Sequence, residues 1–131
     1  MAGRKSEVTV FSLADPTWSD PLPDPGDLRL IYGVEADELV VLIDGTQHSP
    51  AYLAFIGTAD EVYAAIKVDM HSGAVIGVLV YPLAALGVER HPEWRAAMAP
   101  NPRSSVAKRI MMDIKQLYDR YGLIPDTTGL G

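Results

Sequence analysis

Cysteine is absent from the 131-residue chain, and only three histidines are present. Without cysteine there can be no disulfide, thiolate zinc site or thiol nucleophile, so packing alone must stabilise the fold. The chain has no apolar segment long enough to cross a bilayer, and its first residues lack the apolar stretch of a secretory signal. These absences predict a cytoplasmic protein with no membrane partner.

Basic residues are scarce in the first half of the chain. Residues 1–70 contain 4 Lys and Arg against 12 Asp and Glu, whereas residues 71–131 contain 7 against 5, and the net charge is −6. Nucleic-acid binding depends on cations that neutralise phosphates, so this distribution argues against a nucleic-acid partner. The length fits one domain with a single core.

Four prolines lie among acids in residues 15–27, which predicts a linker because each proline removes a backbone donor. The expected organisation is an N-terminal arm and linker over 1–27, one domain over 28–122 and a tail over 123–131. Residues 7–13 fit either a short strand or a mobile arm. Trp18, inside the linker, could seal an edge of the core or anchor a partner.

The domain itself reads as α+β. Turn residues separate five predicted strands at 28–32, 38–44, 51–56, 62–69 and 74–81, and the short connections predict an antiparallel β-meander of four to five strands with sequential strands as neighbours. Short helical segments are expected at 82–87 and 91–98. One long helix is expected at 104–121, capped by Ser104 or Ser105 and ended by Gly122.

The long helix should pack on one face of the sheet through a stripe of apolar side chains: Val106, Ile110, Ile114, Leu117 and Tyr121. The segments 39–43 and 75–81 are apolar on both faces, so one helix cannot cover them. Met112 stands among the polar residues of the helix. These features predict a homo-oligomer, most simply a dimer, with interface candidates Met112, Trp18, Val41, Ile43 and Val78. The alternative is that the N-terminal arm, with Phe11, Leu13 and Trp18, folds back over the second face.

No catalytic apparatus is recognisable. His48, His71 and His91 lie in predicted turns or segment starts without the spacing of a metal pair, and Asp69 beside His71 is expected to bond its own turn. The acids Glu35, Asp37 and Glu38, with Asp44 further along, sit at a solvated corner that does not split carboxyl pKa values. Nucleophile, phosphate-loop and dinucleotide motifs are also missing. We therefore expect no catalytic residue, cofactor or metal.

Two segments resemble a family of small bacterial domains of unknown function. The sequence Tyr32-Gly-Val-Glu-Ala-Asp-Glu-Leu-Val-Val is similar to the family's opening motif, Tyr-Asp-x-Glu-Ala-Asp-x-Leu-Tyr-Ile. The sequence Val68-Asp-Met-His-Ser-Gly-Ala-Val-Ile-Gly-Val-Leu is similar to its later hairpin. The resemblance covers residues 30–86, with Gly33 in place of the usual Asp, and the family lacks the long helix. It implies a compact β-meander with helical cover and no known activity.

The leading functional hypothesis is a non-enzymatic module that associates with itself or binds a protein partner. The alternative from another class is a small hydrolase or isomerase that uses carboxylates near Asp37 and Asp44 with His48 or His71. A third hypothesis is a subunit of a larger hetero-assembly, in which the acidic arm and residues 124–131 dock on a different protein. A concave site joining a histidine and a carboxylate would favour the enzyme, and an uncovered apolar face would favour the module.

Overall fold

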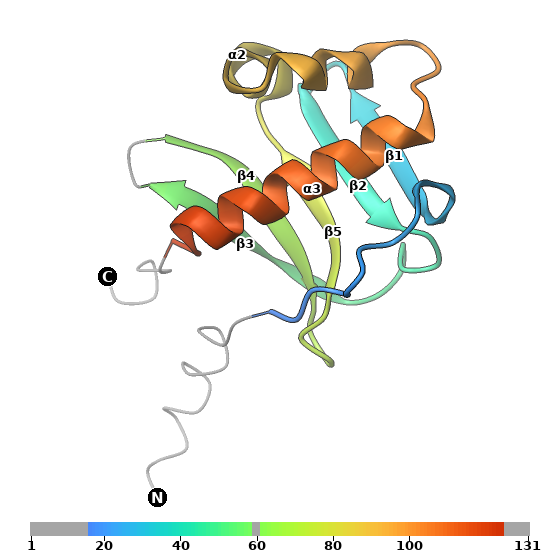
Figure 1. Ribbon diagram of the computed structural model, residues 1–131, viewed down its shortest axis with the longest axis vertical. Helices are drawn as coiled ribbons and strands as arrows, with labels where there is room; N and C mark the ends of the chain where they lie inside the picture. Colours follow the sequence, from blue (N-terminus) through green and yellow to red (C-terminus); the bar gives the residue numbers. More distant parts are fainter. Residues whose placement is uncertain (1–15, 59–60, 125–131) are drawn as a thin grey trace, which may run out of the picture.

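A computed structural model of the chain describes residues 16–58 and 61–124. It has an antiparallel five-stranded sheet, crossed on one face by the long helix α3 (Ser104–Tyr121), so the predicted α+β class is confirmed (Figure 1). The strands are β1 (Leu28–Gly33), β2 (Glu38–Ile43), β3 (Ala51–Thr58), β4 (Glu61–Asp69) and β5 (Val75–Val80). Their order across the sheet is β1-β2-β5-β4-β3.

This order corrects the predicted meander at one connection. β2 pairs with β5 instead of β3, and β3 lies at the far edge beside β4. The connection over residues 44–50 can span about 23 Å, more than the roughly 14 Å that separate strands three positions apart. β2 and β5, the two strands that are apolar on both faces, thereby become neighbours inside the sheet, while β1 and β3 form its edges.

The core lies between the sheet and α3. Ile110 and Ile114 of α3 are fully buried, Val106 and Leu117 are partly buried, and Tyr121 is about half exposed, so the apolar stripe ends one turn before the predicted position. Facing them, the sheet contributes a layer of buried aliphatic side chains: Leu39, Val41, Ile66, Val68, Val78 and Val80. This packing fixes which face of the sheet is closed.

The ends of α3 match the predicted range but not the predicted cap. Arg103 occupies the N-cap position and makes no side-chain cap hydrogen bond, because Ser104 and Ser105 are already inside the helix. Gly122 follows the last turn with φ +70°, a conformation that glycine adopts without strain, and its N–H bonds the carbonyl of Tyr118. No helix in the described ranges is long and apolar enough to span a bilayer.

Short helical segments close one end of the core. A π-helical turn at Leu83–Gly87 leads into α2 (Val88–Arg90), and a 3-10 segment follows at Pro92–Met98, as the sequence predicted. Trp94 of the last segment is fully buried, and its indole Nε1 donates a hydrogen bond to Asp113 of α3 at 2.9 Å. This bond ties the short segment to the long helix.

The described part of the predicted linker packs on the domain. The ring of Trp18 lies 5.6 Å from that of Tyr118, and Lys108 donates hydrogen bonds to the carbonyls of Leu22 and Pro23. Residues 16–24 therefore form a strap on the α3 side of the sheet. The predicted strand or arm at 7–13 lies outside the described residues, as does most of the tail.

Candidate functional site

The carboxylates and histidines of the enzyme hypothesis do not converge. Asp44 lies 3.7 Å from Arg29 in an exposed ion pair, while His48 and His71 are exposed in two different turns. At the hairpin tip, Asp69 accepts hydrogen bonds from the backbone N–H groups of His71 and Ser72, which lower the pKa of its carboxyl. Within the described ranges no three His, Asp or Glu side chains form a group that could hold a metal.

The carboxylate of Asp37 is held by hydrogen bonds within the fold. Its oxygens accept hydrogen bonds from the Tyr32 hydroxyl at 2.6 Å and from the backbone N–H groups of Ala84 at 2.8 Å and Ala85 at 3.1 Å. Burial raises the pKa of Asp37, but these hydrogen bonds outweigh it and leave the pKa below its usual value. Asp37 therefore stays ionised and anchors the start of the 83–90 helical segment.

His91 belongs to an aromatic cluster that sequence reasoning did not find. Its ring stacks on that of Trp94 with centroids 4.0 Å apart, and its Nε2 lies 2.8 Å from the Tyr63 hydroxyl. Burial lowers the pKa of His91 and raises that of Tyr63. The contact of Tyr63 with His91 joins residues 28 positions apart, so no local spacing in the sequence predicts it. The cluster packs the short helical segments against β4 through the ring contacts of Tyr63 with His91 and Trp94.

One row of apolar side chains crosses the sheet on the face that α3 leaves uncovered. The pairing registers of the strands join these five residues as successive cross-strand partners: Ile31, Val40, Leu79, Ala65 and Phe55. Ile31 on one edge strand is 52% exposed and Phe55 on the other is 46% exposed. We call this side of the sheet the open face.

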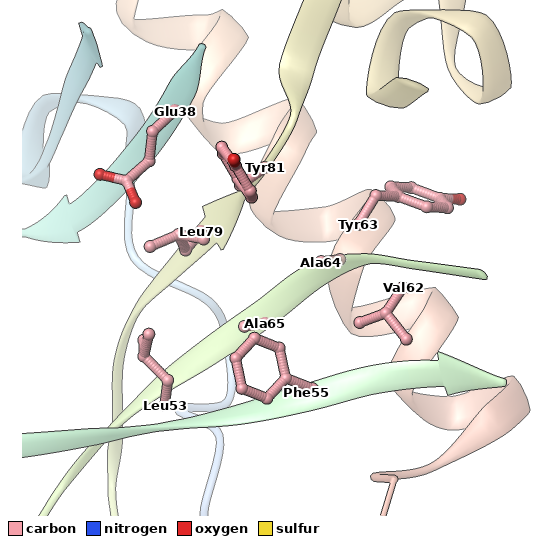
Figure 2. A pocket seen from close by; sticks show the side chains of 9 residues that line it. All are labelled: Glu38, Leu53, Phe55, Val62, Tyr63, Ala64, Ala65, Leu79 and Tyr81. Atoms are coloured by element: carbon pink, nitrogen blue, oxygen red, sulfur yellow. The ribbon is translucent and has the colours of Figure 1, made fainter. Parts of the chain in front are cut away.

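A shallow hollow of about 210 Å³ occupies part of the open face. Figure 2 shows Leu53 and Phe55 of β3 facing Leu79 of β5 across Ala65, with Tyr81 beyond them and Glu38 on the rim. A parallel row of partners lies beside the apolar row and carries two cations: Arg29, Leu42, Gly77, Lys67 and Leu53. The open face is thus apolar along its middle, with charged groups beside it.

None of the five predicted interface residues lies on the open face. Val41 and Val78 are buried in the core beneath α3, which excludes them from a surface, and Ile43 packs against the same core. Trp18 is half-buried in the strap. Met112 is 40% exposed, but it belongs to α3, on the opposite side of the sheet. The alternation along β2 placed Val41 and Ile43 on one face and Val40 on the other, as in the structure. The interface candidates of β2 were taken from the face that α3 covers.

A second hollow, of about 410 Å³, lies where β3 and β4 meet the end of α3. Tyr63, Tyr121, Arg120 and the ion pair of Arg90 with Glu61 line its walls. Hydrogen bonds from Arg90 lower the pKa of Glu61, so this carboxyl stays ionised. A general acid needs a raised carboxyl pKa, and Glu61, the one carboxyl among the described residues that line this hollow, does not have it.

No family of known proteins, no curated protein and no solved structure matches the chain. The resemblance of residues 30–86 to a family of small bacterial domains therefore stays a prediction.

Proposed function

We propose that the protein is a non-enzymatic module that self-associates through the open face of its sheet. The observation that carries this proposal is the apolar row from Ile31 to Phe55, which crosses the sheet from edge to edge. Antiparallel sheets that leave one face in water usually place polar side chains there. A row of aliphatic and aromatic side chains on that face is typical of a surface that another protein covers.

Exposure of this row has an energetic cost. Ile31 and Phe55 are each about half exposed, so covering them would recover roughly half of the 1.5–3 kcal/mol gained by burying such a side chain completely. The described strap does not supply this cover, because Trp18 and Leu22 pack on the α3 side of the sheet. Among the described residues Ile31 and Phe55, at the two ends of the row, stay about half exposed, whereas Ala65 within the row is already buried. A second copy of the chain would cover the exposed ends.

The size of the open face limits the area that a second copy could bury. Five strands spaced about 4.8 Å apart place β1 and β3 roughly 19 Å from each other, and five residues along a strand add about 17 Å. The projected area is then about 300–400 Å² per copy, which is below the roughly 800 Å² per partner of a standard stable interface. We therefore expect a reversible association at micromolar concentrations.

The two other functional hypotheses have less support. The hydrolase hypothesis requires Asp37 or Asp44 to meet a histidine, and each of these carboxylates has a structural partner elsewhere. The hetero-assembly hypothesis would use the same open face for a different protein. It predicts that the isolated chain stays monomeric, which separates it from self-association.

Paired lysine substitutions test the proposal. Ile31→Lys and Phe55→Lys introduce a charge at either end of the apolar row, at positions exposed enough to tolerate it. Met112→Lys is the matched control, because Met112 is similarly exposed on the other side of the domain. Sedimentation velocity should show a concentration-dependent dimer for the unmodified chain and Met112→Lys, and a monomer for the other two. Equal behaviour of all four proteins would contradict the proposal.

A further inference from the structure

We infer that the strap occupies a peptide-binding groove along α3, and that an extended segment of a partner protein with similar chemistry can take its place. The inference concerns the α3 side of the sheet and does not rest on self-association through the open face. The partner segment is proline-rich and acidic with one aromatic residue, because the segment seated in the groove is of that kind: Pro16-Thr-Trp-Ser-Asp-Pro-Leu-Pro-Asp.

The strap lies along α3 as an extended chain. Trp18 contacts Tyr118 near the end of the helix, and Lys108, ten residues earlier in the helix, donates hydrogen bonds to the carbonyls of Leu22 and Pro23. Ten helical residues rise about 15 Å, and the extended chain from residue 18 to residue 23 spans about 17 Å. Because the two lengths agree, the strap runs antiparallel to α3 without looping away from it.

Most contacts of the strap are made by its main chain. The N–H of Thr17 donates to the carbonyl of Gly73, and its carbonyl accepts from the N–H of Val75, both at 2.9 Å. Lys108 also bonds main-chain carbonyls, and Trp18 supplies one aromatic anchor. Main-chain pairing combined with a seated side chain is how folded domains recognise extended peptides. Another extended segment with an aromatic residue can make the same contacts.

The groove carries a positive charge that the strap does not neutralise. Lys115 lies beside the Trp18 ring and pairs with Asp119 of its own helix. Lys108 has no carboxylate partner among the residues that the structure describes, and Asp20 of the strap forms no ion pair there either. A partner segment whose acids reach Lys108 would gain an attraction that the strap lacks.

Two features favour release of the strap. Residues 19–21, between its two attachment points, are exposed. The indole N–H of Trp18 is buried with no acceptor in the described part of the chain, whereas that of Trp94 donates to Asp113. Release returns the N–H of Trp18 to water, which offsets part of the cost of losing its packing. A segment with few buried contacts can open while the domain stays folded.

Hydrogen exchange at low urea concentrations tests release of the strap in the unmodified chain. The amide of Val75 bonds Thr17 of the strap, whereas Val78 of the same strand lies between β2 and β4. Val75 should exchange through a local opening that does not depend on urea, and Val78 only through global unfolding, which urea promotes. Trp18→Ala should speed the exchange of Val75 at least about tenfold, because it removes the anchor.

A labelled peptide of residues 16–26 tests binding in trans. The receptor is the full chain with Trp18→Ala and Leu22→Ala, which remove both apolar contacts of its own strap, checked first by circular dichroism. It should bind the peptide at least about tenfold more tightly than the unmodified chain, whose tethered strap competes at millimolar effective concentration. In the same background Lys108→Met should weaken binding roughly tenfold. Arg120→Met, which removes a cation lining the second hollow, should not.

Three results would overturn the inference. Exchange of Val75 with the same urea dependence as Val78 would make the strap a permanent part of the fold. Absence of peptide binding, or equal binding of a scrambled peptide, would show that the groove does not recognise the segment. Dimerisation that Trp18→Ala abolishes, without peptide binding, would assign the groove to the strap of a second copy. If the double variant does not fold, Trp18→Ala alone is the receptor, with the same expected order of affinities.

Discussion

The contribution of Asp37 to the stability of the fold can be predicted from its contacts. Its carboxylate accepts hydrogen bonds from the first free N–H groups of the 83–90 segment and from Tyr32, while its backbone has φ +56°. Three substitutions separate these two roles. Asp37→Gly removes the carboxylate and keeps the backbone relaxed, Asp37→Ala removes the carboxylate and strains the backbone, and Asp37→Asn keeps one acceptor and tolerates positive φ.

The magnitudes follow from the two roles. Loss of a helix cap costs about 0.5–2 kcal/mol of unfolding free energy, and Ala84 and Ala85 are exposed enough for water to replace part of the bonding. We expect Asp37→Gly to cost about 1 kcal/mol and Asp37→Asn roughly half of that. Asp37→Ala should cost about 1–2 kcal/mol more than the glycine variant, because alanine is strained at positive φ.

Urea denaturation of the four proteins at neutral pH measures these differences, and a pH series adds a second check. Because the folded pKa of Asp37 lies below its usual 3.8, its stabilisation is complete above that value and is lost as the pH falls through the folded pKa. The difference between the unmodified chain and Asp37→Asn should therefore shrink only in acid. Glycine and alanine variants as stable as the unmodified chain would refute the anchoring role.

Three further predictions concern the core and the turns. Ile114→Ala should lower the unfolding free energy by about 2–5 kcal/mol because it empties a fully buried site, whereas Met112→Ala should change it by less than about 0.5 kcal/mol. Asp113→Ala should cost roughly 1–3 kcal/mol because it leaves the buried indole N–H of Trp94 unpaired, a loss that thermal unfolding would show. His71→Ala should leave both stability and association unchanged, since the side chain is exposed at a hairpin tip; reduced association in sedimentation would contradict this.

The fold was largely predictable because apolar periodicity is a local signal. Alternation along the sequence separates Leu39, Val41 and Ile43 from Val40 and Leu42, and the helical period of residues 104–121 locates α3 and its buried side chains. The local apolar pattern could not predict which face of the sheet α3 would cover, because both faces of β2 carry apolar side chains. Two of the candidate interface residues, Val41 and Val78, therefore lie in the core beneath α3.

The strand order and the polar contacts depend on residues far apart in the sequence. A seven-residue connection after β2 permits either neighbouring or distant strands, so the pairing of β2 with β5 is decided by burial of two doubly apolar strands. The contacts of Asp37 with Ala84 and of Tyr63 with His91 likewise cross long stretches of chain. Turn and cap propensities predict a polar residue at such places, but not its partner.

The central claim, that the open face is covered by a second copy, is tested most directly by intermolecular contacts in solution. Isotope-filtered NMR on an equal mixture of labelled and unlabelled chain reports which methyl groups of one copy lie against the other. Contacts from the methyl groups of Leu79, Val40 and Ile31 are the predicted result. Intermolecular contacts confined to Met112, or none at concentrations well above micromolar, would contradict the claim.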